Sequence, residues 1–289
     1  MNSPFDLSNH DAYQRWREQK LADAPHSADE LLVEVRDPRA LTPAEHDALL
    51  ARIHRCNMAL YASPDRASDT DILRLLGRQF GLVQLDANWL ASEGGVSEIK
   101  VVEGGTRKFY IPYTNRPIKW HTDGYYNPPE RSIHAMVLHC VRSAREGGDN
   151  RLLDHELAYL LLRDQNLEHI RALMQPDAMT IPERVDETDG VRPAQSGPVF
   201  SLDAAGKLHM RYTARTRSIV WKQDAATLAA VAALEVLLGS DSPYILHAHL
   251  EPGMGLICNN ILHDRSAFTD DPVSPRLLYR ARYHDRITS

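Results

Sequence analysis

One short segment, Trp120-His121-Thr122-Asp123, constrains this chain most when it is read together with Leu262-His263 far downstream. Side chains on a β-strand alternate with a period of two, so a His-x-Asp sequence places both side chains on one face. A histidine from a distant strand would complete a set of two imidazoles and one carboxylate. That set suits Fe(II) and leaves three coordination positions open. The pattern therefore requires a fold that brings two distant strands together.

The tripeptide alone is weak evidence. Random placement of 14 histidines and 39 acidic residues in 289 positions predicts about two copies of His-x-acid. The chain holds two, His121-Thr122-Asp123 and His249-Leu250-Glu251. The residues around each copy must therefore show whether it could bind a metal.

The second copy lies in a strand-like stretch where His247, His249 and Glu251 share one face. Residues i and i+4 of a regular strand lie about 13 Å apart, so these three side chains cannot hold one ion. We interpret them as structural or as support for other residues. His134, His139 and His155 have no partner pattern, and we interpret them as structural too.

Short β-rich runs dominate the chain from about residue 99 onward, and helical stretches interrupt them. Many short strands separated by polar turns are typical of a sandwich or jelly roll. The expected strands are 99–102, 108–112, 118–122, 133–141, 199–202, 208–212, 244–250, 255–260 and 277–284, with helices over 154–174 and 224–238.

The first part of the chain has its own signals. Residues 1–30 predict a helix or an arm packed on the body, 33–36 and 57–62 predict strands, and 69–80 predicts a helix ended by a glycine. Thr42, Pro43 and Glu45 form the start of another helix, with Thr42 as N-cap and Glu45 as its capping-box partner. That helix is expected to turn Leu49, Leu50, Ile53 and His54 toward a core.

Composition excludes several classes of protein. A net charge of −6 gives no support to nucleic-acid binding, and no apolar run is long enough to span a membrane. The N-terminus lacks a signal-peptide pattern. The three cysteines, Cys56, Cys140 and Cys258, are odd in number and widely separated, which argues against a disulfide framework and favours a reducing cytoplasm.

The last predicted strand carries alternating arginines. Its period of two places Arg276, Leu278, Arg280 and Arg282 on one face, and Leu277, Tyr279, Ala281 and Tyr283 on the other. A buried arginine requires an anion, and a dicarboxylate would pair well with the guanidinium fork. The alternative is a strand face that is simply solvated.

With these segments in view, the chain resembles the Fe(II)/2-oxoglutarate-dependent taurine dioxygenase (TauD/TfdA-like) superfamily, with some likeness to the γ-butyrobetaine hydroxylase branch. The similar segments occur in the family's order over roughly residues 100–285, and Leu76 to Gly81 is similar to the family's Phe-Gly helix end. They are Trp120-His121-Thr122-Asp123, Gly147-Gly148-Asp149-Asn150, Leu262-His263, and Pro275-Arg276 with Arg280.

The resemblance implies that His121, Asp123 and His263 hold Fe(II) as the catalytic centre. It implies that Arg276 binds the distal carboxylate of 2-oxoglutarate and that Arg280 lies near the other end of the cosubstrate or the substrate. Asn150 stands where the family often has Thr or Ser contacting that carboxylate. Asp123 argues against the halogenating relatives, in which a small residue replaces the carboxylate.

The fold implied by the resemblance is mostly β with inserted helices, a double-stranded β-helix (jelly roll, clavaminate synthase-like). The chain would be a single oxygenase domain over 1–289, in which residues 1–95 pack on a core formed by 96–289. The implied cofactors are Fe(II), 2-oxoglutarate and O2. Hydroxylation of a C–H bond, with release of succinate and CO2, is the default outcome.

The substrate is expected to be a small polar or charged molecule. The sequence leaves the oligomeric state undecided, and a homo-oligomer is one possibility. The side chains that flank the metal strand are candidates for its pocket: Tyr113, Asn115, Tyr125, Tyr126 and Asn127. Several tyrosines can form a cage for a quaternary ammonium group, or they can pack as half-buried aromatics. Arg280 or Arg215 could instead pair with an anionic group.

Two other functions compete with the oxygenase. A zinc-dependent hydrolase or lyase could use the same three ligands, but it would not explain the arginines after His263 and would need neither O2 nor 2-oxoglutarate. A non-catalytic jelly-roll binding or sensing protein would bind metal without forming succinate.

Overall fold

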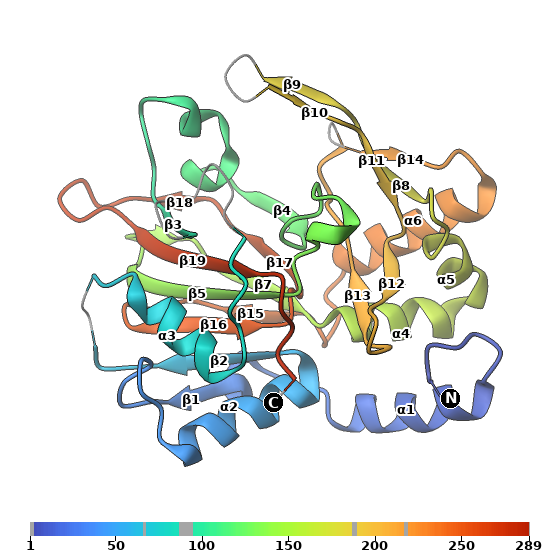
Figure 1. Cartoon of the computed structure of the whole chain (residues 1–289), viewed down its shortest axis with the longest axis horizontal. Coiled ribbons are helices and arrows are strands. Elements are labelled where there is room, and N and C mark those ends of the chain that lie inside the picture. The colour runs from blue at the N-terminus through green and yellow to red at the C-terminus, as the bar shows by residue number, and fades with distance from the viewer. Residues whose placement is uncertain (1–2, 66–67, 87–94, 187–189, 217–218, 289) are drawn as a thin grey trace.

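Two β-sheets lie face to face in the computed structural model, which describes residues 3–65, 68–86, 95–186, 190–216 and 219–288 (Figure 1). Apolar side chains from both sheets form one core between them, including Leu138 and Leu256 from the larger sheet and Leu152 and Leu246 from the smaller. Burial of this shared core holds the two sheets together.

The larger sheet has six strands and is antiparallel except for its first pair. Its order is β1 (Leu32–Glu34), β2 (Met58–Ala62), β16 (Met254–Cys258), β5 (Ala135–Arg142), β19 (Leu277–Tyr283) and β3 (Val96–Ile99). The smaller sheet is antiparallel, in the order β15 (Leu246–Ala248), β7 (Asn150–Leu153), β17 (Leu262–Arg265) and β4 (Ile118–His121).

Helices α2 (Pro43–Cys56) and α3 (Asp71–Gln79) pack on the other face of the larger sheet. Leu49 and Leu76 from these helices meet Val137, Ile257 and Tyr279 from the strands. The alternation predicted for the last strand is confirmed. Its apolar and aromatic face packs under these helices, whereas Leu278 belongs to the core between the sheets.

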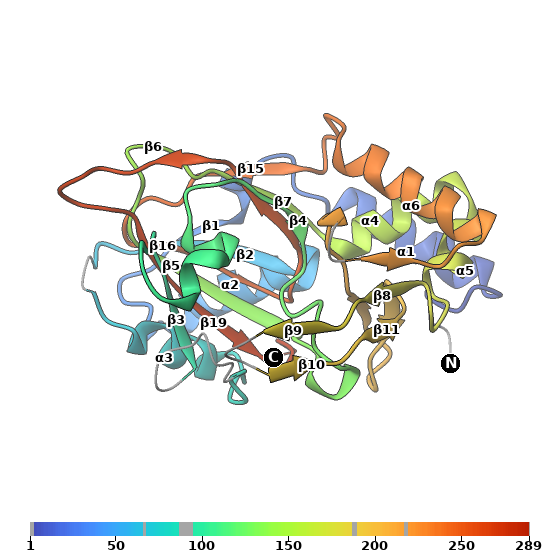
Figure 2. The ribbon, with the colours of Figure 1, turned by 90° about the horizontal axis from the view of Figure 1, so that it is seen from above.

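The remaining helices gather beside the sheets in what we call the helical lobe (Figures 1 and 2). It contains α1 (His10–Ala22), α4 (His155–Gln165), α5 (Leu167–Leu173) and α6 (Ala225–Leu238), together with β8 (Met179–Ile181), β11 (Gln195–Gly197), β14 (Val220–Trp221), β12 (Phe200–Leu202) and β13 (Leu208–Met210). A hydrophobic core of its own includes Leu157, Phe200 and Leu234. None of the helices in the described ranges is long and apolar enough to cross a bilayer.

Short elements complete the chain. The hairpin β9 (Arg184–Asp186) and β10 (Gly190–Arg192) extends from β8 and β11 (Figure 2). Strands β6 (Glu146–Gly147) and β18 (Phe268–Thr269) pair with each other, and single 3₁₀ turns are η1 (Ala28–Leu31), η2 (Thr106–Phe109), η3 (Ile111–Tyr113) and η4 (Pro129–Arg131).

Local capping signals are confirmed. Thr42 accepts a hydrogen bond from the Glu45 backbone, and the Glu45 side chain accepts one from the Thr42 backbone, which is the predicted capping box of α2. Asp224 caps α6 in the same way by accepting from the Thr227 N–H. These contacts satisfy donors that a helix leaves free at its first turn.

Several expectations are wrong. His54 is exposed because it lies one residue past Ile53, which rotates it off the buried face of α2. Residues 108–112 form no strand, because Tyr110 and Tyr113 donate to carbonyls three residues back and form 3₁₀ turns. The helix expected over 154–174 breaks at Asn166, whose side chain caps α5. With the helical lobe included, the protein is a mixed helix-and-sheet structure rather than a mostly β one.

A buried histidine in the larger sheet makes stability depend on pH. His139 is fully buried and bonds through Nδ1 to the Tyr61 hydroxyl at 2.9 Å, with Gly255 lying between the two residues in the sheet. A Cβ at Gly255 would approach the Tyr61 ring to 2.4 Å, so only glycine leaves room for that ring. Burial lowers the pKa of His139 to about 4.

We expect this histidine to destabilise the fold in acid. Its pKa is lower in the folded than in the unfolded chain, so the unfolded chain binds more protons as pH falls from about 6.5 toward 4. Between about pH 7 and about pH 5 the free energy of unfolding should fall by about 2 kcal/mol through His139. Denaturant titrations of the wild type and His139→Gln should show a flatter pH dependence in the variant. His54→Gln, on an exposed helix face, is the control, and equal slopes for all three proteins would contradict the assignment.

Candidate metal centre

The pairing of β4 with β17 sets two histidines opposite each other. His121 and His263 are Cα partners in this antiparallel pair, and their ring centroids lie 4.2 Å apart. The side chain of Asp123, two residues beyond His121, lies close to both imidazole rings. One ligand atom from each of these three residues lies within 4.8 Å of the others, and all three residues are buried. His263 lies within a short strand of its own, β17, which the sequence analysis did not predict after the strand expected over 255–260.

The two imidazoles are oriented by their own backbones. The Nδ1 atom of His121 lies 3.0 Å from the Lys119 carbonyl oxygen, and that of His263 lies 3.0 Å from the Ile261 carbonyl oxygen. A carbonyl accepts only, so each Nδ1 carries the proton and each Nε2 keeps a free lone pair. Such second contacts commonly orient histidine ligands of metals.

The carboxylate of Asp123 is only partly satisfied. Its Oδ1 accepts from the Arg280 guanidinium at 3.1 Å and lies 4.0 Å from Nε2 of His121, whereas its buried Oδ2 has no hydrogen-bond partner. A buried carboxylate oxygen without a partner is costly. A cation between the two imidazoles and this oxygen would satisfy it, so the residues present fit a divalent metal.

Protonation states in the centre also suit a metal. Burial would raise the pKa of Asp123, but Arg280 and Arg282 outweigh it and hold that pKa well below its usual range. Burial, together with the neighbouring His263, lowers the pKa of His121 to about 3. At neutral pH, Asp123 is therefore ionised and His121 is neutral, as metal ligands must be.

Asn260 fixes the backbone that carries Asp123, a role that the sequence did not indicate. Its Oδ1 accepts from the Asp123 N–H at 2.8 Å, and its Nδ2 donates to the Asp123 carbonyl at 2.9 Å and to the Ile133 carbonyl at 2.6 Å. Asn260 has a left-handed backbone with φ of 49°, a conformation that asparagine tolerates better than most residues. The pair Asn259-Asn260, shortly before His263, was the feature of the sequence that could have indicated this role.

A small cavity of about 50 Å³ lies between the two sheets next to the metal centre. Its lining comes from both sheets and contains three arginines. The lining residues are Ile99, Pro112, Ile118, His121, Met136, Leu138, Asn150, His263, Asp264, Arg265, Arg276, Leu278 and Arg280. The structure thus brings Asn150, Arg276 and Arg280 to the same cavity as the two histidines.

Arg276 is a buried cation at the edge of this cavity. Its guanidinium lies 5.0 Å from the centroid of the Phe268 ring, only 5 % of the residue is exposed, and burial lowers its pKa. Asp270 accepts a hydrogen bond from the Arg276 backbone N–H, and no ion pair to the guanidinium is found in the described part of the chain. A buried guanidinium without a carboxylate favours an anionic ligand.

Two glycines allow close packing beside Arg276, one against its guanidinium and one against the neighbouring backbone. Gly148 has φ of 80°, and a Cβ there would approach Nε of Arg276 to 3.3 Å. Gly147 has φ of 72°, and a Cβ there would meet the Ala267 carbonyl oxygen at 2.3 Å. Any other residue would strain the backbone at both positions. The Gly-Gly pair therefore has a packing role beside the cavity.

Arg265 is a second buried cation, which sequence reasoning missed. Its NH2 donates to the carbonyls of Thr114 and Arg116, and burial with the nearby charge of Arg276 lowers its pKa to about 9. Arg265 lies two residues after His263 on the same strand, and this spacing could have indicated that both side chains face the same side of the sheet.

Arg280 and Asn150 have partners within the protein. Arg280 forms an ion pair with Asp123, so it contacts a proposed metal ligand directly. The Asn150 amide donates to the Asp264 carbonyl at 2.7 Å. Both side chains still line the cavity.

The candidate substrate residues do not gather in one place. Tyr113 is buried beneath the Arg107 guanidinium, Asn115 is exposed, and the Asn127 amide donates to the Arg131 carbonyl. Tyr125 and Tyr126 lie edge to face, with ring centroids 5.2 Å apart. The guanidinium of Arg192 already lies 4.9 Å from the centroid of the Tyr126 ring, which stands against a cage for an ammonium ligand.

The remaining histidines form no comparable centre. His247 and His249 are exposed, and His249 bonds to Asp149 at the surface. In the ranges that the structure describes, His121, Asp123 and His263 are the one group of three close metal-ligating residues. His155 bonds to the Leu208 carbonyl oxygen, as expected for a structural residue.

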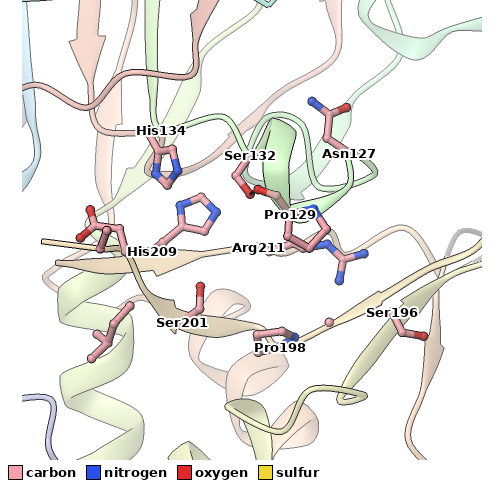
Figure 3. A pocket seen from close by; sticks show the side chains of 13 residues that line it. Asn127, Pro129, Ser132, His134, Ser196, Pro198, Ser201, His209 and Arg211 are labelled. Atoms are coloured by element: carbon pink, nitrogen blue, oxygen red, sulfur yellow. Dashed lines mark hydrogen bonds between the residues drawn. The ribbon is translucent and has the colours of Figure 1, made fainter. Parts of the chain in front are cut away.

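A separate cavity of about 360 Å³ lies between the loop after β4 and the β12–β13 hairpin (Figure 3). His134 and His209 meet there with ring centroids 4.7 Å apart. Arg211 donates to the carbonyls of Tyr125, Met179 and Gln195, and thereby ties the loop that follows Asp123 to the helical lobe. This cavity contains none of the three proposed metal ligands.

Known proteins similar to this chain include a family of dioxygenases and two of its individual relatives. The family model described as "Taurine catabolism dioxygenase TauD, TfdA family" matches residues 29–282. A uridine-5'-phosphate dioxygenase from Amycolatopsis sp is 34% identical over 169 residues, which cover 57% of this chain and 60% of that protein. One from Streptomyces sp is 32% identical over 174 residues, which cover 58% of this chain and 62% of that protein. The chain thus matches less than two thirds of the length of these relatives.

Among solved structures, the non-heme iron oxygenase OrfP in complex with Fe and alpha-ketoglutaric acid has a similar fold. Its TM-score is 0.61 at 18% sequence identity, and the match covers 84% of this chain and 80% of that one.

Removal of a ligand should prevent metal binding. We expect His121→Ala and Asp123→Ala each to weaken Fe(II) binding by at least about 100-fold, because each removes one of three protein ligands. Anaerobic calorimetric titration measures this directly. His247→Ala, an exposed histidine on β15, is the control. Wild-type affinity in both ligand variants would refute the assignment.

Proposed function

The chain belongs to the taurine catabolism dioxygenase TauD, TfdA family, and from that premise we propose that it is an Fe(II)- and 2-oxoglutarate-dependent oxygenase. The observation that carries the proposal is the convergence of His121, Asp123 and His263 beside the unpaired, buried guanidinium of Arg276. A metal centre and a site for a dicarboxylate therefore share one small cavity. The recognition of the family from its motifs is confirmed.

In this proposal the protein positions the reactants. Nε2 of His121, Nε2 of His263 and the free Oδ2 of Asp123 hold the metal, while Arg280 keeps Asp123 ionised and in place. Fe(II), 2-oxoglutarate and O2, when bound, supply the oxidation of a substrate C–H bond with release of succinate and CO2. Met136 and Leu138 form part of the cavity wall, and this apolar surface helps to exclude water from the site.

Arg276 is proposed to bind the distal carboxylate of 2-oxoglutarate through its guanidinium fork. Asn150 lines the same cavity and is proposed to assist, although its amide already donates to Asp264. Arg265 brings a second cation to the cavity, which favours an anionic occupant.

We propose that the two facing sheets form a double-stranded β-helix within a single domain over 1–289. Support comes from their shared core and from the similarity to the iron oxygenase structure. Strands β1 and β2 join the larger sheet, so residues 1–95 contribute to the body that carries β19. A cytoplasmic location is the proposed setting, and the three free, buried cysteines are consistent with it.

The proposed substrate is a small charged metabolite, hydroxylated at a C–H bond. The two relatives bear the name uridine-5'-phosphate dioxygenase, which makes a nucleoside monophosphate the leading candidate. A metal-dependent hydrolase, a lyase or a sensing protein would use the same ligands, but none of them accounts for the unpaired Arg276 in the metal cavity.

An anaerobic titration tests the proposal. Addition of Fe(II) and then 2-oxoglutarate should produce the metal-to-ligand charge-transfer band, and admission of O2 should yield succinate. Zinc-dependent turnover without O2 would favour the hydrolase. Metal binding with neither band nor succinate would favour the sensing protein.

Arg276 supplies a more specific prediction. Arg276→Ala should raise the KM for 2-oxoglutarate by about 10- to 100-fold, which corresponds to the loss of a charged hydrogen bond. Fe(II) affinity should stay unchanged. Arg276→Lys keeps the charge without the fork and should give an intermediate KM. An unchanged KM in Arg276→Ala would place the cosubstrate elsewhere.

A further inference from the structure

The aromatic pair that follows Asp123 is held among three arginines from distant parts of the chain. Arg282 on β19 donates to the Tyr126 hydroxyl at 2.9 Å, and Arg215 donates to the Tyr125 hydroxyl at 3.4 Å. Arg192 on β10 lies over the Tyr126 ring. Three cations thus surround two adjacent tyrosines.

Of these three cations, Arg282 alone has a carboxylate partner among the residues that the structure describes. Arg282 is buried and forms an ion pair with the buried carboxylate of Asp86, which Arg131 also contacts. The contacts found for Arg192 and Arg215 in the described ranges are with the tyrosines, and none is with a carboxylate. Both arginines are partly buried, so among the described residues two positive charges without a carboxylate partner flank the aromatic pair.

The pair lies at the edge of the proposed metal centre. Tyr125 comes two residues after Asp123 along the chain. Arg215 comes two residues after Thr213, which pairs with His121 in a β-bridge and accepts a hydrogen bond from the Arg215 N–H. An anion bound between these arginines would therefore lie beside the proposed metal.

Arg192 belongs to a hairpin that extends from the helical lobe. The β9–β10 hairpin leaves β8 and β11 and reaches back toward the sheets (Figures 1 and 2). Arg184 on β9 lies 5.0 Å from the centroid of the Tyr110 ring, and Arg192 on β10 lies 4.9 Å from that of Tyr126. The hairpin thus spans from the η2–η3 turns to the loop after Asp123.

We propose that Arg192 and Arg215 bind the phosphate monoester of the substrate, with Tyr125 and Tyr126 fixed between them. The inference rests on the proposed oxygenase function and names the group that the site recognises. Two guanidinium forks match a tetrahedral oxyanion, and a phosphate monoester carries nearly two negative charges at neutral pH. A sulfonate has the same shape but one charge, so it would leave one arginine without compensation.

Binding to the anaerobic enzyme loaded with Fe(II) and 2-oxoglutarate tests this assignment. Calorimetry should show that uridine 5'-monophosphate binds more tightly than uridine. Arg192→Gln and Arg215→Gln should each raise the Kd of the nucleotide by about 10-fold or more, the loss expected for a charged hydrogen bond, while uridine affinity stays unchanged. Arg184→Gln, on the partner strand of the hairpin, is the matched control and should retain the wild-type Kd.

The charge-transfer band, recorded in every sample, separates this inference from the proposed function. A band with no preference for the nucleotide over uridine, or with wild-type Kd values in both variants, would overturn the phosphate site and leave the oxygenase intact. Absence of the band in the wild type would contradict the oxygenase itself. If taurine binds as tightly as the nucleotide and loses affinity in both variants, the site recognises sulfonates and the phosphate assignment is wrong.

Discussion

The register between β4 and β17 is the constraint on which the rest of the site depends. Pairing sets His121 opposite His263, and Asp123, just past the end of β4, brings a ligand atom within 4.8 Å of theirs. A shift of either strand by one residue would turn its histidine to the opposite face of the sheet, away from the other histidine. Asn260 stabilises this arrangement, because its side chain bonds both to the Asp123 backbone and to the carbonyl of Ile133, which lies just before β5.

Arg276, which immediately precedes β19, and Arg280 and Arg282 within β19 differ in how their charges are compensated. Arg276 and Arg282 are buried and Arg280 is largely buried, and an unpaired buried charge is costly. Arg280 is compensated by Asp123 and Arg282 by Asp86, whereas Arg276 has no carboxylate partner in the described part of the chain. The internal pairs fix the centre and its aromatic neighbour, and Arg276 supplies the charge to which we propose that the cosubstrate binds.

The helical lobe contributes to the site through contacts rather than ligands. Arg211 joins it to the Tyr125 carbonyl, and the β9–β10 hairpin brings Arg192 to Tyr126. The loop after Asp123 is therefore held from both sides. A substrate bound as we propose would contact both the helical lobe and the sheets.

The set of His121, Asp123 and His263 joins distant residues and was recognised from the resemblance to a known family. Local patterns in the sequence were enough to predict the capped start of α2 and the two faces of β19. Each depends on neighbours a few positions apart, whose geometry is set by helix or strand periodicity. Tertiary structure alone decided that β17 is a separate strand, that Arg280 pairs with Asp123, that Asp86 neutralises Arg282, and that Arg192 covers Tyr126. These contacts join residues far apart in the chain, and no local period records which distant charge or ring will arrive.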